Sequence, residues 1–350
     1  MKKKVLITCV LILIILYIVS GEKLDIPFNI NYYGISPGAE ALGMGYAFSS
    51  GVSSPAMVFW NPANISLLEK AVIYIDFAKY DSVDIADLIN YENGLKGSRI
   101  DFFSIVYKDG GISWHPISKS LIEDSIIIGG DTTIYLKASS HIDEFIFTFT
   151  SMLGNKNYSG PIYYGFNLKY YNGILAYGKS IFINSIFITN NIEIDYGHGF
   201  GTDFSILYDA KKLKAGLTIN NIFSRVLWGK HKTGKIPTRF NLSLAAIPTD
   251  NFGIGIEVTK FTISSPFIFA AGIRGNLSGS KWYNNFIYSA GAYADALNFS
   301  PDNTIYSAGL GYNIKKLRIN TSVSGYISQF TNSFNPEYRI SISTIYDNKL

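Results

Sequence analysis

The sequence predicts an all-β protein, a transmembrane antiparallel β-barrel of about 14 strands with an N-terminal hatch segment in its lumen. Three observations predict this fold. Aromatic residues make up 15% of the chain and charged residues only 16%, whereas a soluble domain usually carries about 25% charged residues. Short segments that alternate apolar and small polar residues recur along the chain. After residue 21, no apolar stretch approaches the roughly 20 residues of a spanning helix.

The first 21 residues have the layout of a signal peptide. Three lysines precede an apolar run from Val5 to Val19, which is shorter than the roughly 20 residues that a membrane anchor needs. We therefore expect cleavage after residue 21. The only cysteine, Cys9, lies in this leader, so disulfides, thiol catalysis and cysteine-bound metals are not expected in the mature chain.

Charge and motif content exclude several classes of function. Without the three leader lysines, 27 basic residues face 26 acidic ones, and this near-neutral balance gives no support for a nucleic-acid partner. The four histidines are not spaced as metal ligands, and no Gly-x-Ser-x-Gly elbow is present. We expect no cofactor, no metal and no catalytic residues. An outer-membrane enzyme whose catalytic set comes from separate strands stays an alternative.

Residues 38–66 form a Gly-rich, apolar segment ahead of the strands. Glycines at positions 38, 43, 45 and 51 argue against one continuous helix, since each costs about 1 kcal/mol relative to Ala inside a helix. Ser54 offers a cap and Pro55 a first helical position, so a short helix from about Pro55 to Trp60 is expected. A turn should follow at Asn61-Pro62. The segment is too apolar for a solvated linker, so it should pack against another part of the protein.

The strand array is expected to run from Ala71 to Tyr346. Within Ile162–Tyr170 one face carries bulky apolar residues, and the other carries Gly165, Asn167 and Lys169. The same alternation appears in segments 213–220, 239–244, 252–259, 317–324 and 338–346. The second face consists largely of Gly, Ser, Thr and Asn, which is too poorly charged for the outside of a soluble sandwich. We therefore expect the apolar face to meet lipid and the small polar face to line the lumen.

Some parts of the array are less regular. Periodicity is weak in residues 80–131 and 172–199, and the polar stretches 81–96 and 228–237 are expected to be loops outside the membrane. No second core or linker is evident, so the mature chain should form one domain.

Two strings of residues carry a resemblance to a known family. They are Gly38-Ala39-x-Ala41-Leu42-Gly43-Met44-Gly45-x-Ala47-Phe48 and, further on, Trp60-Asn61-Pro62-Ala63. Later segments follow in a matching order: an internal strand at 165–170, a hairpin from 199, a strand 213–221 that ends in Asn, a loop with Trp228, and a strand led by Pro237. Together they resemble the PorV/PorQ-like outer-membrane proteins, relatives of the FadL-type hydrophobic-compound channels. The chain departs from that family at Tyr46, where a Gly is expected, and at 53–55, where Ser-Ser-Pro replaces an acidic pair.

We therefore expect a signal peptide at 1–21, a hatch at 22–70 and an outer-membrane barrel at 71–350. The resemblance implies that the hatch enters the lumen with its Asn61-Pro62-Ala63 turn against the wall. The Asn61 side chain should then satisfy neighbouring backbone groups, and Pro62 should fix the turn. The hatch motif consists of Gly38, Gly43, Met44, Gly45, Trp60, Asn61, Pro62 and Ala63.

The leading functional hypothesis is a FadL-like barrel in the cell outer membrane, which passes or holds a hydrophobic small molecule and is not an enzyme. Its partners would be outer-membrane lipid and that small molecule. A first alternative is a PorV-like accessory barrel that binds secreted proteins in a type IX secretion system. A second is a structural outer-membrane protein with an occluded lumen.

Overall fold

The structure is a computed structural model that describes residue 25 and residues 37–79, 98–128, 132–153, 160–183, 186–261, 266–277, 285–295, 300–326 and 336–346. The predicted signal peptide with Cys9, most of residues 22–36 and the predicted loop at 81–96 lie outside the described residues.

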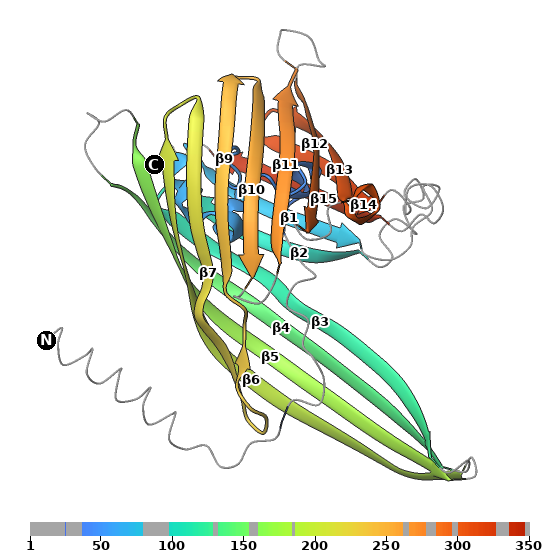
Figure 1. Cartoon of the computed structure of the whole chain (residues 1–350). Helices are drawn as coiled ribbons and strands as arrows, with labels where there is room; N and C mark the ends of the chain where they lie inside the picture. The colour runs from blue at the N-terminus through green and yellow to red at the C-terminus, as the bar shows by residue number, and fades with distance from the viewer. Residues whose placement is uncertain are drawn as a thin grey trace, which may run out of the picture.

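A single antiparallel sheet closes on itself to form a barrel (Figure 1). Within the described residues, fourteen strands of nine residues or more make up the wall, and the two-residue β8 pairs with β7. The first strand pairs with the last from Ala71↔Tyr346 onward, and this pairing closes the barrel. The predicted barrel of about 14 strands between Ala71 and Tyr346 is therefore confirmed. The strands are β1 (Ala71–Lys79), β2 (Ser98–Tyr107), β3 (Gly110–Ile128), β4 (Thr132–Leu153), β5 (Ile162–Ile183), β6 (Ile186–Asp209), β7 (Leu213–Trp228), β8 (Gly234–Lys235), β9 (Arg239–Thr249), β10 (Phe252–Phe261), β11 (Phe267–Asn276), β12 (Phe286–Asp295), β13 (Ile305–Ile314), β14 (Leu317–Tyr326) and β15 (Glu337–Tyr346).

The two faces of the wall follow the predicted alternation. In β9 the side chains of Phe240, Leu242 and Leu244 are exposed on the outside, whereas the intervening polar side chains, such as Asn241 and Ser243, are buried in the lumen. In β5, Asn167 and Lys169 are buried and Leu168 is exposed. The outer surface is therefore apolar and the inner surface small and polar, as a barrel surrounded by lipid requires.

The strands define two different ends of the barrel. Turns of two residues at 108–109, 250–251 and 315–316 lie at the end where β1 begins and β15 finishes. We call this the short-turn end.

Four strands extend beyond the opposite end (Figure 1). β3, β4, β5 and β6 contain 19, 22, 22 and 24 residues, about twice the 9–11 that cross a membrane. The weakly periodic residues 172–199 lie largely in this extension. Both faces of β5 are half-buried from Ala176 to Phe182, so neither lipid nor a packed lumen imposes an alternation there.

The segment before β1 fills the inside of the barrel. It contains helix α2 (Ala39–Gly43), helix α3 (Met57–Trp60) and a 3₁₀ helix, η1 (Pro62–Leu67). Its apolar side chains pack with those of β1, β2 and β4 in one buried cluster that includes Phe48, Met57 and Phe102. The predicted helix at 55–60 exists but begins at Met57 after a turn, and no side chain caps it.

No helix in the described part of the chain has the length and hydropathy needed to cross a bilayer.

Candidate functional site

The internal segment 37–68 lies directly against glycines of the wall. A Cβ atom at Gly255 would meet the Ala47 carbonyl oxygen, and one at Gly272 would meet that of Met44. Because each glycine faces backbone or side-chain atoms of the segment, no larger residue fits at these positions without moving it. The wall glycines in such contacts are Gly165 on β5, Gly216 on β7, Gly255 on β10, Gly272 on β11, Gly291 on β12 and Gly309 on β13.

The first half of the predicted hatch motif makes these close approaches. Gly38 has φ 107° and donates its N–H to Asp76 Oδ2 at 3.0 Å. A Cβ at Gly43 would lie 3.1 Å from the Cα of Gly309, and the Met44 backbone lies over wall glycines. Gly45 has φ 60°, and a Cβ there would lie 2.5 Å from the Ala292 nitrogen. These positions require small residues or left-handed backbone, which explains the glycines in the motif.

The second half of the motif lies against β5, β6 and β7. Trp60 is buried and donates its ring N–H to the Pro37 carbonyl at 2.9 Å. Pro62 begins η1 beside Gly165, and the Ala63 N–H donates to Ser205 Oγ at 2.8 Å. The side chain of Asn61, although fully buried, has no hydrogen-bond partner among the described residues. The expectation that Asn61 satisfies neighbouring backbone groups is therefore wrong, because backbone bonds within α3 and η1 already occupy those groups.

Tyr46 adopts the left-handed conformation that a glycine would favour. Its φ is 63°. Its ring stacks on Trp60 at a centroid distance of 5.2 Å and meets Tyr293 of β12 edge-on at 5.0 Å. The aromatic contacts offset the unfavourable backbone, since each contributes about 0.5–1.5 kcal/mol and left-handed backbone costs about 1–2 kcal/mol.

Buried charged side chains of the wall hold the segment at three points. Asp76 of β1 accepts from the Gly38 and Ala39 N–H groups, and Glu257 of β10 accepts from the Ser49 N–H at 3.2 Å and hydroxyl at 2.5 Å. Arg239 of β9 donates to the Phe59 carbonyl at 3.0 Å. Each contact joins residues far apart in the sequence.

Glu40 is a charged residue of the segment itself. It accepts hydrogen bonds from Arg274 and Arg318, both at 3.3 Å. Burial raises the pKa of Glu40, but the charges of Arg274 and Arg318, together with hydrogen bonds to the carboxylate, hold the pKa below its ordinary value.

The wall is irregular between β6 and β7. Phe200 pairs with Arg225, and Phe204 pairs with Ile219. The chain advances four residues between these pairs on β6 but six on β7, so β7 carries two extra residues. The backbone accommodates the two extra residues by adopting positive φ values at Asn221 (61°) and Phe223 (55°). Such bulges bend a strand and interrupt its pairing. Phe223 is 86% exposed on the outside of the barrel.

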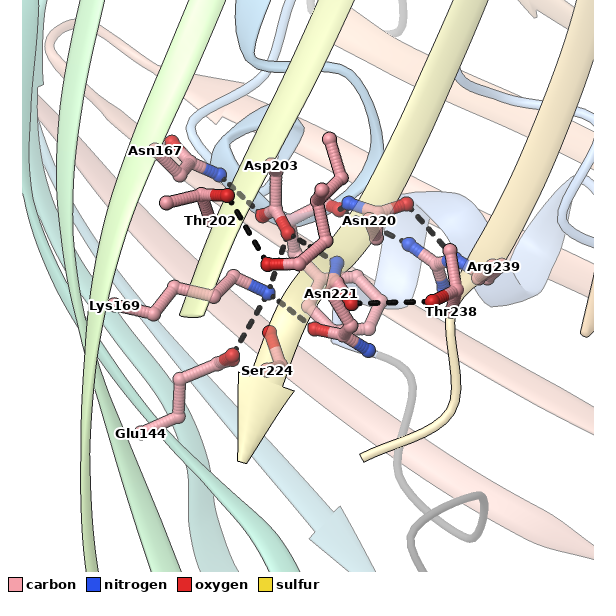
Figure 2. Close-up of polar contacts among 12 residues, drawn as sticks. Glu144, Asn167, Lys169, Thr202, Asp203, Asn220, Asn221, Ser224, Thr238 and Arg239 are labelled. Carbon is pink, nitrogen blue, oxygen red and sulfur yellow. Dashed lines mark hydrogen bonds and ion pairs between the residues drawn. The ribbon is translucent and has the colours of Figure 1, made fainter. Parts of the chain in front are cut away.

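A polar network supports this bulge from the lumen (Figure 2). Lys169 Nζ lies 2.8 Å from Glu144 Oε1 and 2.9 Å from Asp203 Oδ1, and donates to Asn221 Oδ1 at 2.9 Å. The backbone N–H of Asn221 donates to Asp203 at 2.7 Å, and its side-chain amide donates to the Pro237 carbonyl at 3.0 Å. Side chains from β4, β5 and β6 thus fix Asn221 in its left-handed conformation.

An apolar pocket lies beside the bulge. Its volume is about 400 Å³, and we call it the wall pocket. Lys169 also lines it, but the ammonium group is already paired with two carboxylates. The pocket therefore offers hydrocarbon surface and no free positive charge. Its other lining residues are Phe147, Leu168, Tyr170, Phe200, Gly201, Thr202, Ile222 and Phe223.

The sequence interpretation missed this part of the wall. It ended a strand at Asn221 and placed Trp228 in a loop, whereas β7 continues through the bulge to Trp228. The Trp228 ring is buried against Gly173 and Gly197. Two residues with positive φ break the alternation at 221–223, and a break in alternation looks like the end of a strand. The Asn-Asn pair at 220–221 is the one signal that could have indicated left-handed backbone.

Among the described residues, no group of three or more His, Cys, Asp or Glu side chains is arranged to hold a metal ion.

No protein-family model matches the chain, and no curated protein matches it. Several solved structures do. The Ralstonia pickettii toluene transporter TbuX shares 10% identity over 90% of this chain and 100% of that chain, with a TM-score of 0.52. The Pseudomonas putida toluene transporter TodX shares 11% identity over 93% of this chain and 98% of that chain, with a TM-score of 0.48. A Pseudomonas aeruginosa FadL homologue shares 11% identity over 93% of this chain and 100% of that chain, with a TM-score of 0.42. The likeness to TbuX is one of fold.

Proposed function

We propose that this protein is an outer-membrane barrel that binds hydrophobic small molecules and passes them through its wall and lumen. The observation that carries the proposal is the wall pocket, which places about 400 Å³ of apolar space beside a break in strand pairing. Ligand pockets of this size are mostly apolar and suit small molecules. A hydrophobic molecule gains about 25 cal/mol for each Å² of apolar surface that it buries.

The internal segment would be the movable element of this route. We propose that the chain is divided into a leader at 1–21, a hatch at 22–70 and a barrel at 71–350. Supporting this division, residues 37–68 lie inside the barrel and are held by scattered hydrogen bonds, not by strand pairing. The eight motif residues Gly38, Gly43, Met44, Gly45, Trp60, Asn61, Pro62 and Ala63 would seat the hatch on the wall glycines.

The test follows uptake of a small aromatic hydrocarbon into proteoliposomes that contain lipopolysaccharide. Toluene is a suitable probe, because TbuX is a toluene transporter. Ile222→Trp, which fills the wall pocket, should lower the rate several-fold. Leu242→Trp is the matched control, since Leu242 is an exposed outward residue of β9 outside the pocket. Equal rates for the wild type and Ile222→Trp would refute the role of the wall pocket.

A second experiment tests the hatch. Deleting residues 38–66 should change the rate of uptake, and an unchanged rate would refute a gating role. Heat-dependent migration on gels shows whether each variant still forms a barrel.

A PorV-like accessory role is the second candidate. The motif strings at 38–48 and 60–63 support it, and so does the extension of β3–β6, which carries exposed apolar residues beyond the wall such as Ile186, Ile188 and Ile192. Exposed apolar stripes of this kind are typical of protein-binding surfaces. Co-purification of secreted proteins or secretion-system subunits from native outer membrane would favour this role. A protein without uptake, bound ligand or partner would instead be a structural barrel with an occluded lumen.

A further inference from the structure

A second pocket lies at the short-turn end of the barrel and shares no lining residue with the wall pocket. Its volume is about 210 Å³, and we call it the mouth pocket. Part of its lining comes from the internal segment at Gly51–Ser53, part from the β9–β10 turn at 250–251, and part from Arg274 and Arg318. The mouth pocket therefore lies where the internal segment meets the short turns.

The two arginines of the mouth pocket share one carboxylate. Arg274 Nη2 and Arg318 Nη1 each lie 3.3 Å from the same oxygen, Glu40 Oε1. Charge-assisted bonds are usually about 2.7–2.9 Å long, so both contacts are weak. Arg318 also donates from Nε to Asn313 Oδ1 at 2.8 Å. Each guanidinium has five N–H donors, so most of them are not used by these partners.

The charge balance favours an anion. Glu40 neutralises one of the two arginines, which leaves one positive charge among the three groups. Both guanidinium side chains remain accessible, with exposed fractions of 16% for Arg274 and 28% for Arg318. Asp250, on the exposed β9–β10 turn, also lines the pocket and opposes an anion from the rim.

The remaining lining indicates the kind of anion. Ile247 and Phe252, both half-buried, contribute apolar surface to the pocket. A bare inorganic ion would leave this surface exposed to water, whereas a small organic acid would cover it. Carboxylates suit the planar fork of a guanidinium, which can donate two parallel hydrogen bonds.

We propose that the mouth pocket binds a small amphipathic carboxylate, with its anionic group on Arg274 and Arg318 and its apolar body against Ile247 and Phe252. This site is separate in chemistry from the wall pocket, where the Lys169 ammonium is already paired. The alternative is that both arginines serve only to hold Glu40, and thus the internal segment, in place.

The test measures binding at equilibrium to the full mature chain in lipid nanodiscs. The probe is 4-fluorobenzoate, observed by ¹⁹F NMR, and its neutral analogue is 4-fluorobenzyl alcohol. Empty nanodiscs correct for partition into lipid. The wild type should bind the carboxylate at least tenfold more tightly than the alcohol. Acetate, which lacks the apolar body, should bind several-fold more weakly than the benzoate.

Variants separate ligand binding from a structural role. Arg274→Gln and Arg318→Gln should each weaken benzoate binding about 10- to 100-fold, because each removes hydrogen bonds to a charged group. Asp250→Asn should strengthen binding about two- to fivefold, since it removes the opposing charge. Lys235→Gln, on β8, removes an exposed positive charge outside the pocket and should leave binding unchanged.

Two results would overturn the proposal. One is equal binding of benzoate and the alcohol to the wild type. The other is unchanged benzoate binding in both arginine variants, with each shown to be folded by its heat-dependent gel migration. Since binding is measured without transport, a failure of hydrocarbon uptake would refute the proposed function and leave this result intact.

Discussion

Arg339 on the last strand donates a hydrogen bond of 2.6 Å to Asp76 on the first strand, and both side chains are fully buried in the lumen. Arg339 also donates to Asp101 of β2 at 2.8 Å. Asp76 in turn accepts from the N–H groups of Gly38 and Ala39. One arginine thus connects the strands that close the barrel with the segment inside it.

Arg339→Met should destabilise the barrel strongly. The substitution leaves Asp76 and Asp101 buried without their cation, and breaking a buried ion pair in this way costs about 3–5 kcal/mol. Unfolding by urea in detergent micelles, followed by heat-dependent gel migration, measures the loss. Adding Asp76→Asn and Asp101→Asn to the same chain should recover most of the stability. A triple variant no more stable than the single one would show that lost packing, not uncompensated charge, causes the effect.

Gly255→Val should displace the internal segment. A side chain at this position meets the Ala47 carbonyl oxygen, and backbone cannot yield as a flexible side chain can. Protease digestion in detergent should then cut residues 38–66 much faster than in the wild type. Gly253→Ala is the matched control two residues earlier on β10, because a Cβ there finds its nearest atom at 3.7 Å. Equal protection of the segment in both variants would contradict the close contact.

At position 46 a glycine variant should be more stable than an alanine variant, which is the reverse of the order at most positions. Both Tyr46→Gly and Tyr46→Ala lose the ring contacts with Trp60 and Tyr293, and should be less stable than the wild type by about 3–5 kcal/mol. Only glycine relieves the left-handed backbone. The glycine variant should therefore be more stable than the alanine variant by about 1 kcal/mol in urea unfolding. The opposite order would show that the backbone relaxes when the ring is removed.

The two faces of the wall could be predicted from the sequence. Side chains alternate between the faces of a strand, and the residues on the outer face are apolar because they contact lipid. Leu168 and Lys169 are adjacent in the sequence and were correctly assigned to opposite faces. The contacts of the internal segment were beyond this kind of reasoning. Ser49 and Glu257 are 208 positions apart, and no local pattern indicates that they meet.

The wall pocket could not be predicted for a related reason. It depends on two extra residues in β7, and an insertion into one strand is visible only when the partner strand is known. Lys169 was correctly placed in the lumen, but its partners Glu144 and Asp203 come from two other strands. For Asn61 the sequence predicted contacts that do not exist. An amide side chain suggests hydrogen bonds, but the surroundings of Asn61 provide none among the described residues.

A disulfide between the internal segment and the wall tests whether uptake needs the segment to move. A Cβ built at Gly51 lies 3.1 Å from the Cβ of Ala245 on β9, close to the 3.5–4.5 Å or so that disulfides span. The only native cysteine is Cys9, in the predicted leader, so Gly51→Cys with Ala245→Cys introduces a single pair into the mature chain. Oxidation should lower hydrocarbon uptake several-fold, and a reductant should restore it, because the bond holds the segment against β9. Each single-cysteine variant should respond to neither treatment. If the oxidised double variant transports as fast as the reduced one, the hydrocarbon passes without displacement of this part of the segment.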